Sequence, residues 1–191
     1  MRTSICAFAA LCVAALVMGC QTTPKSAEKK EDLAAAAQRQ VDAMIAKDPG
    51  LRDVIDKSYA NAVFPKIGKG GVIVGGAYGR GVVHEQGSMI GYADMTQASV
   101  GAQLGGQTYS ELISFENKEA LERFKQNKLA LSANLSAVII EAGAAKAAKY
   151  TDGVAVFVMP RAGAMAEASV GGQKFTFVAD ESAGPTTRTA Q

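Results

Sequence analysis

The sequence predicts an α+β fold in which N-terminal helices pack on a curved, mainly antiparallel β-sheet, with one further short helix. Near the start of the folded region, apolar residues recur at helical spacing, as at Leu33, Ala37 and Val41. From Gly70 onward the pattern changes to period two and to short apolar runs separated by glycines, which is typical of strands and their turns. Whether such a sheet is barrel-like or sandwich-like stays open at this level.

The first 19 residues have the pattern of a secretion signal rather than of a folded element. Arg2 precedes an apolar run from Ile5 to Val17, which is short for a membrane span and is soon followed by Gly19-Cys20. The motif "VMGC" is typical of a bacterial lipobox and predicts cleavage before Cys20, with palmitate-type acyl chains attached to this cysteine. An ordinary cleaved signal and an uncleaved anchor are the alternatives. No A-x-A-like site lies in place for the first, and no charge cluster directly follows the run for the second.

The cysteines and the residue after the lipobox extend this prediction. All three cysteines, Cys6, Cys12 and Cys20, lie in this segment, so an exported mature chain has no disulfide and depends on its own core. Gln21 follows the lipobox, and no Asp is there to retain the protein at the inner membrane. By resemblance to lipoproteins of Gram-negative bacteria, the expected location is the outer membrane, either facing the periplasm or exposed at the surface.

The rest of the chain is predicted to form a tether, one folded domain and a tail. Residues 20–31 are the lipidated cysteine and a flexible tether, residues 32–180 the domain, and residues 181–191 a disordered tail. A first helix over 32–48 has a small, Ala-rich apolar face, which favours packing on a core over lying on a membrane. Asp48 is the expected N-cap of a second helix, with Pro49 in its first turn, that continues through Phe64 and ends at Pro65.

Strands account for most of the remaining pattern. They are predicted over 70–79, 81–85, 87–95, 98–115, 129–140, 153–160 and 173–180. The run 129–140 is included because apolar residues alternate with Ser and Asn in it. A short helix is expected over Asn117–Lys125, with Leu121 and Phe124 facing inward, and 141–153 is ambiguous between helix and strand.

The stretch "GKGGVIVGGAYGRG", Gly68 to Gly81, raises the choice between phosphate binding and close packing. A P-loop needs Lys and Ser or Thr where this sequence has Gly76 and Ala77. A dinucleotide fingerprint needs a third glycine and a helix after "GRG", and neither pattern is present. The glycines are therefore interpreted as positions where strands bend or approach one another closely.

The residues that carry most enzyme chemistry are scarce. His84 is the only histidine, and Ser88 stands where an H-E-x-x-H zinc motif needs its second one. No G-x-S-x-G elbow is present, so no nucleophilic or metal-dependent enzyme and no cofactor is expected, although a paired-carboxylate site stays open. His84 is interpreted as a half-exposed strand residue. A net charge of +2 and the absence of Trp argue against nucleic acid as a partner.

Two sequence blocks carry a resemblance to a known family. "YANAVFPKIGKGGVIVGGAYGRGVV" resembles the signature of the SYLF domain, a lipid-binding and actin-regulator domain of eukaryotic endocytic proteins that is widespread in bacteria. "SVGAQLGGQTYSELISFENKEALERF" is similar to its next block, and the resemblance covers Leu33 to Val178. The chain departs from the eukaryotic pattern over 137–148, where a G-P-x-G turn is missing. The arrangement of the last strands therefore stays open.

The resemblance implies a non-enzymatic domain that binds lipid or membrane. Its basic positions match Lys66, Lys69 and Arg80, which are expected to bind anionic head groups; ordinary solvated charges are the alternative. Actin is a partner only by distant resemblance, and neither actin nor phosphoinositides are expected in a periplasm. The expected function is that of a membrane-anchored lipoprotein that binds lipid or anionic envelope components. The alternative is a structural or protein-interaction module of the envelope without a small ligand.

Overall fold

The computed structural model describes residues 26–71, 74–100, 106–129, 131, 137–162 and 172–180. The helices in these ranges are α2 (Ala27–Lys47), α3 (Leu51–Lys57), α4 (Lys118–Lys125) and the short 3₁₀ helix η1 (Ala144–Ala147). The strands are β1 (Ala60–Gly71), β2 (Val74–Glu85), β3 (Ser88–Val100), β4 (Gly106–Phe115), β5 (Val138–Ile139), β6 (Val154–Ala162) and β7 (Gln173–Ala179). The predicted signal peptide, Cys20, residues 21–25 of the tether and the tail 181–191 lie outside the described residues, and residues 27–31 of the predicted tether belong to α2.

The strands form one seven-stranded sheet, with the order β5-β6-β4-β1-β2-β3-β7. Every neighbouring pair is antiparallel except β5 and β6, which are parallel. The α+β fold class and the mainly antiparallel sheet are confirmed. Since β5 and β7 are edge strands, the sheet is open and does not close into a barrel.

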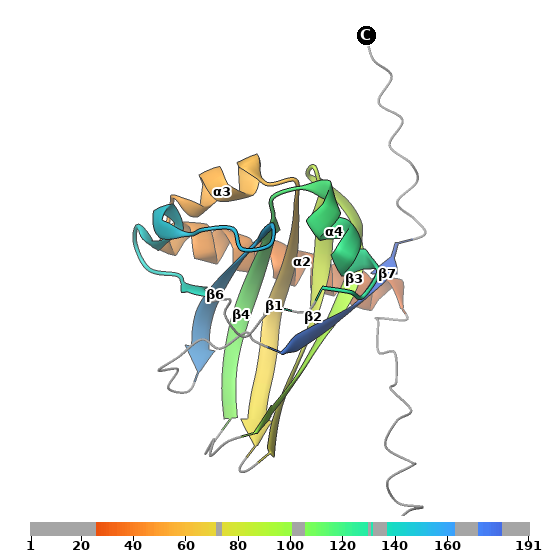
Figure 1. The fold of residues 1–191 in the computed structure, drawn as a ribbon. Coiled ribbons are helices and arrows are strands. Elements are labelled where there is room, and N and C mark those ends of the chain that lie inside the picture. Colours follow the sequence, from red (N-terminus) through yellow and green to blue (C-terminus); the bar gives the residue numbers. More distant parts are fainter. Residues whose placement is uncertain are drawn as a thin grey trace, which may run out of the picture.

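The sheet is strongly curved. Phe64 on β1 and Phe175 on β7 are three strands apart in the sheet, which in a flat sheet is a separation of roughly 14 Å. Their ring centroids are only 5.8 Å apart. The edge strand β7 therefore folds over one face of the sheet, as Figure 1 shows where β7 crosses in front of β1 and β2. We call the enclosed side the concave face and the opposite side the convex face.

Each face carries its own apolar core. The concave core is closed by α4, whose Phe124 lies 5.2 Å from the rings of both Phe115 and Phe175. The convex core is covered by α2, α3 and η1 (Figure 1), with fully buried side chains at Met44, Leu51, Leu112, Ile140 and Phe157. The central strands are thus covered on both sides.

The first predicted helix and the short helix are confirmed. Helix α2 begins after Ser26, whose hydroxyl accepts a hydrogen bond from the backbone N–H of Lys29 at 3.4 Å. Helix α4 begins after Asn117, whose side-chain oxygen accepts from the N–H of Ala120 at 2.9 Å. As predicted, Leu121 and Phe124 of α4 are fully buried.

The second predicted helix is largely wrong. Helix α3 ends at Lys57, and the residues that were expected to continue it to Phe64 form the start of β1. Ala60, Ala62 and Phe64 face the concave core while Val63 faces the convex core, so apart from Asn61 this segment is apolar on both sides. One polar residue is too little to reveal the strand period, and alanines suit a helix equally well.

The predicted capping role of Asp48 is also corrected. The N-cap of α3 is Gly50, and Asp48 ends α2. The buried Asp48 carboxylate accepts from the N–H of Gly50 at 3.1 Å and from the N–H of Ala145 at 2.6 Å. It therefore fastens the turn between α2 and α3 to η1, far along the chain.

Pro65 does not end a helix but lies in an irregular part of β1. The pairing of β1 with β2 shifts register between Val63 and Lys66, and its pairing with β4 shifts between Phe64 and Ile67. Proline has no N–H for a ladder hydrogen bond, so this bulge is where the strand tolerates it.

The glycine-rich stretch serves close packing, as interpreted from the sequence. A Cβ at Gly81 would lie 2.6 Å from the carbonyl oxygen of Val63, and one at Gly79 would lie 2.5 Å from Cγ1 of Ile67. Both glycines are on β2: Gly81 lies opposite the bulge in β1, and Gly79 pairs with Ile67 just after it. Their missing side chains allow the two strands to bend toward the concave core.

The strands from β2 onward agree with the sequence-based predictions only in part. The predictions for β3, β6 and β7 are confirmed to within a few residues. The predicted strands 70–79 and 81–85 are not separate, since they cover the end of β1 and nearly all of β2. The predicted strand 98–115 covers the end of β3 and all of β4, with residues 101–105 outside the described residues. Of the predicted strand 129–140, residues 130 and 132–136 lie outside the described residues and only β5 is strand. Leu129 instead donates its N–H to the carbonyl of Arg123 at 3.1 Å, which ends α4. The ambiguous segment 141–153 contains η1.

Candidate functional site

Two of the three predicted basic residues are brought together on the convex face. Lys66 on β1 is the direct register partner of Arg80 on β2. The bulge before Lys66 sets this register, and strand alternation then turns Ile67 to the concave core and Lys66 outward. Residues fourteen apart in the sequence thereby place two cations side by side.

These two cations border a shallow hollow of about 320 Å³. Leu33 of α2 supplies an apolar wall to it, and strands β1 and β2 supply the rest. We call it the basic hollow; it is lined by Leu33, Pro65, Lys66, Gly68, Tyr78, Gly79 and Arg80.

The two cations differ in how far they are neutralised. Arg80 Nε donates to the Tyr78 hydroxyl at 2.7 Å and lies 3.8 Å from the Asp94 carboxylate. The Tyr78 hydroxyl in turn donates to Asp94 at 3.1 Å, so the guanidinium is held in one orientation. Lys66 is exposed and forms no ion pair within the described part of the chain. Among the described residues, the hollow thus presents one ammonium without an ion-pair partner and one guanidinium that Asp94 partly neutralises.

Lys69 does not join this pair. It is the register partner of Ala77, whose side chain belongs to the concave core. Lys69 is therefore half-buried on the other side of the sheet from Lys66 and Arg80. The three basic positions predicted as one head-group site are split between two faces. Cys20, the predicted lipid-attachment residue, lies outside the described residues.

Comparisons with known proteins agree with the resemblance seen in the sequence. Residues 96–184, slightly less than half of the chain, match the sequence model of the Ysc84 family, described as "Las17-binding protein actin regulator". A curated relative, "Beta cell expansion factor A" of Aeromonas veronii, is 27% identical over 130 residues, which cover 68% of this chain and 49% of the relative. The chain therefore spans about half the length of this relative. Over residues 96–184 the chain therefore matches the Ysc84 family of SYLF domains.

The segment that matches the family model does not form the sheet alone. It supplies the end of β3 and all of β4, β5, β6 and β7, whereas β1 and β2 lie between β4 and β3 in the sheet. Within the sheet, the matched strands β5, β6 and β4 are therefore connected to β3 and β7 through β1 and β2. The basic hollow lies on these two strands, outside the matched segment.

The interior of the domain holds an acidic residue that the sequence analysis did not single out. Glu111 of β4 is fully buried on the concave face, where its Oε2 accepts from Nε2 of Gln173 at 2.9 Å. Its Oε1 has no hydrogen-bond partner among the described residues. Burial raises the pKa of the Glu111 carboxyl to about 7, although the hydrogen bond from Gln173 lowers it in part. In the strand "YSELISF", side-chain alternation places Glu111 on the same face as Tyr109 and Ile113. The sequence pattern could therefore have indicated that this glutamate is buried.

His84 is a half-buried residue of β2, as the sequence predicted. Burial lowers the pKa of its imidazole, so the ring is neutral at pH 7. The described residues include no group of three or more His, Cys, Asp and Glu side chains placed to hold a metal ion. None of the helices in the described ranges has the length and hydrophobicity to span a bilayer.

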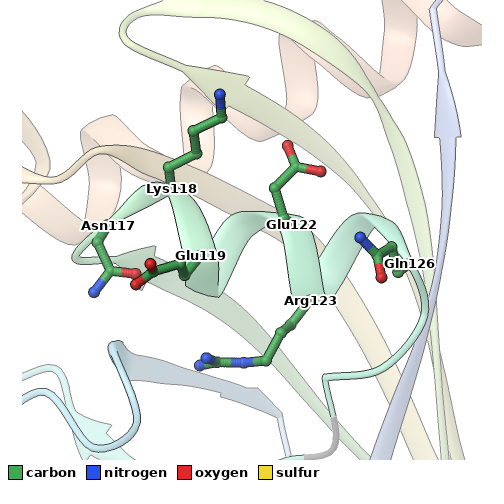
Figure 2. Close-up of a pocket in the computed structure, with 6 residues that line it drawn as sticks. All are labelled: Asn117, Lys118, Glu119, Glu122, Arg123 and Gln126. Atoms are coloured by element: carbon green, nitrogen blue, oxygen red, sulfur yellow. The ribbon is translucent and has the colours of Figure 1, made fainter.

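A larger hollow, of about 660 Å³, runs along α4. Figure 2 shows that the side chains lining it radiate from the helix and do not converge on one point. Arg123 donates to the carbonyl of Asp152, and Glu122 pairs with Lys125 at 3.2 Å. With both signs of charge and these local partners, the hollow is a solvated helix face, and the basic hollow is the better candidate for a binding site.

Proposed function

We propose that this protein is a lipid-anchored lipoprotein of the outer membrane whose SYLF domain contacts anionic head groups through the basic hollow. The observation that carries the proposal is the pairing of Lys66 with Arg80 beside the apolar Leu33. An ammonium, an oriented guanidinium and an apolar wall suit the boundary between phosphate groups and acyl chains. In this proposal the domain has no enzymatic role.

The position of α2 supports the proposal. Helix α2 begins at Ala27, and Leu33 lies about 9 Å further along it at 1.5 Å per residue. The residues between Cys20 and Ala27 reach at most about 25 Å when extended. A lipid on Cys20 would therefore hold the hollow within roughly 35 Å of the bilayer, on the face where the chain enters the domain.

The small number of cations in the basic hollow explains why the proposed head-group contact needs a lipid anchor. Each cation near an anionic surface contributes about 1 kcal/mol, so two of them give only a weak contact. The pairing of Arg80 with Asp94 reduces this further. An acylated Cys20 keeps the domain at the membrane and raises the effective concentration of head groups, which makes a weak contact sufficient.

Vesicle co-sedimentation of residues 26–191, which contain every described element, tests the head-group contact. We expect weak binding to anionic vesicles that falls as salt rises, and no binding to neutral vesicles. The double variant Lys66→Ala/Arg80→Ala should abolish it. The control Lys118→Ala/Lys128→Ala removes the same charge elsewhere on the surface and should retain most of it. No binding to any vesicle would refute the lipid contact and leave the protein-interaction module.

The anchor is tested separately in the full chain. We expect a clickable palmitate analogue to label the protein in a Gram-negative host and to be lost in Cys20→Ala. Labelling that survives this substitution would refute lipid attachment at this residue.

A further inference from the structure

A second pocket on the convex face shares no residue with the basic hollow. It has a volume of about 410 Å³, within the range of roughly 300–1,000 Å³ typical of small-molecule sites. It lies where α2, α3, β1 and β2 meet, and we call it the helix pocket. It is lined by Ala37, Gln38, Val41, Arg52, Ile55, Asp56, Ser58, Asn61, Val63, His84, Gln86 and Gly87.

The sheet supplies hydrogen-bonding groups to this pocket. His84 on β2 is the register partner of Asn61 on β1, and both are half-buried. No hydrogen bond or ion pair engages the His84 imidazole within the described residues. Because burial lowers its pKa, the neutral ring offers one N–H donor and one acceptor.

Asn61 adds a further donor. The Ser58 hydroxyl lies 2.7 Å from the carbonyl of Ile55 and 3.0 Å from the side-chain oxygen of Asn61. The Asn61 oxygen therefore accepts from the Ser58 hydroxyl, and the Asn61 NH₂ forms no hydrogen bond within the described residues. Both of its N–H groups are available to a ligand.

The two helices supply apolar walls and a charged rim. Val41 and Ile55 are partly buried and pack against the convex core, leaving apolar surface toward the pocket. Arg52 and Asp56 are exposed at the rim, one turn apart on α3. They form no ion pair with each other, and Arg52 has no acidic partner within the described residues. Its guanidinium is therefore available to an incoming anion.

We propose that the helix pocket binds a small monocarboxylate with an apolar body. The carboxylate lies between the Arg52 guanidinium and the N–H groups of His84 and Asn61, and the apolar body lies against Val41 and Ile55. The one carboxylate at the rim, Asp56, opposes the ligand's charge and limits its affinity. The site goes beyond the proposed lipid contact and does not depend on it.

The single histidine makes this site directly observable. In untagged residues 26–191, the imidazole Hε1 signal in proton NMR comes from His84 alone. We use octanoate as the probe and octylammonium as its cationic counterpart of equal chain length. Octanoate should shift the signal saturably and raise the pKa of His84, because a nearby anion favours the imidazolium.

Substitutions at the rim test the polarity of the site. Arg52→Gln should weaken octanoate binding by roughly tenfold or more, since it removes a charged hydrogen bond. Asp56→Asn should strengthen it about two- to fivefold, since it removes a like charge. Val41→Trp should block the pocket, and Lys118→Ala, at an exposed site on α4, should leave octanoate affinity unchanged. Circular dichroism checks that each variant is folded.

Three results would overturn the proposal. They are a His84 signal that octanoate does not shift, octylammonium binding more tightly than octanoate, and an Arg52→Gln variant that binds octanoate as tightly as the parent. The last two would show that the pocket takes a cationic or a purely apolar ligand. Vesicle binding by the same proteins reports on the basic hollow, so the two proposals can fail independently.

Discussion

Replacing Glu111 by Gln should remove a loss of folding stability that the buried carboxyl causes as the pH rises. Glu111 is on β4 and its partner Gln173 is on β7, four strand steps away in the sheet. The contact exists because the sheet curves, and it places a carboxyl where water does not reach. A glutamine keeps the shape of the side chain and stays neutral at every pH.

The sign and size follow from the pKa of Glu111. Burial raises it from 4.5 to about 7 in the folded protein. Below about pH 4 the carboxyl is protonated in both the folded and the unfolded chain, so it does not affect their balance. Between these pKa values the unfolded chain releases the proton while the folded one holds it, and above about pH 7 the folded protein carries a buried anion. The total loss of unfolding free energy is about 3 kcal/mol, at 1.36 kcal/mol per pKa unit.

Urea unfolding of both proteins at several pH values between 4 and 9 measures this loss. The variant should be close to the parent at pH 4 and more stable by about 3 kcal/mol at pH 8, with most of the change between pH 5 and 7. Glu141→Gln, at an exposed site, controls for the loss of a charge. A difference between Glu111→Gln and the parent that does not vary with pH would refute the reasoning.

Three further substitutions test the packing, each by urea unfolding at constant pH. Gly81→Ala should lower the free energy of unfolding by about 2 kcal/mol, because its Cβ would meet the β1 backbone. Gly70→Ala, where a Cβ has open space, should lower it by less than about 1 kcal/mol. Equal losses in the two variants would contradict the close approach of β1 and β2. Asp48→Ala should cost roughly 2–4 kcal/mol, since two backbone N–H groups lose their acceptor, and a loss as small as that of the exposed Asp42→Ala would contradict this role. Phe124→Ala should cost about 3–5 kcal/mol, and a loss below about 1 kcal/mol would show that α4 is not part of the core.

The strands with one polar side and the capped helix could be predicted from the sequence. In α4, Asn117 is a good N-cap and the apolar residues Leu121 and Phe124 are spaced for one face. The start of β1 could not be predicted in this way. Its residues are buried on both sides by α2 and by the concave core, so the choice between helix and strand is made by tertiary packing.

The candidate site was predictable as a set of residues but not as an arrangement. The partnership of Lys66 with Arg80 depends on the register of β1 and β2, which a bulge sets after Val63. The separation of Lys69 from Lys66 follows from side-chain alternation alone, since residues three apart in a strand face opposite sides of the sheet. That inference needed β1 to be recognised as a strand, and the helical interpretation of the preceding residues concealed it.

The most direct test of the proposed function asks which surface touches the membrane. Residues 26–191 contain no cysteine, so a single introduced one can carry an environment-sensitive NBD fluorophore. Gly68→Cys places it in the basic hollow at a position with open space for a side chain, and Glu119→Cys places it on α4. With anionic vesicles the NBD emission should shift to the blue and intensify at position 68 and stay unchanged at position 119. A response at 119 alone, or equal responses at both positions, would contradict the assignment of the basic hollow as the membrane-contacting surface.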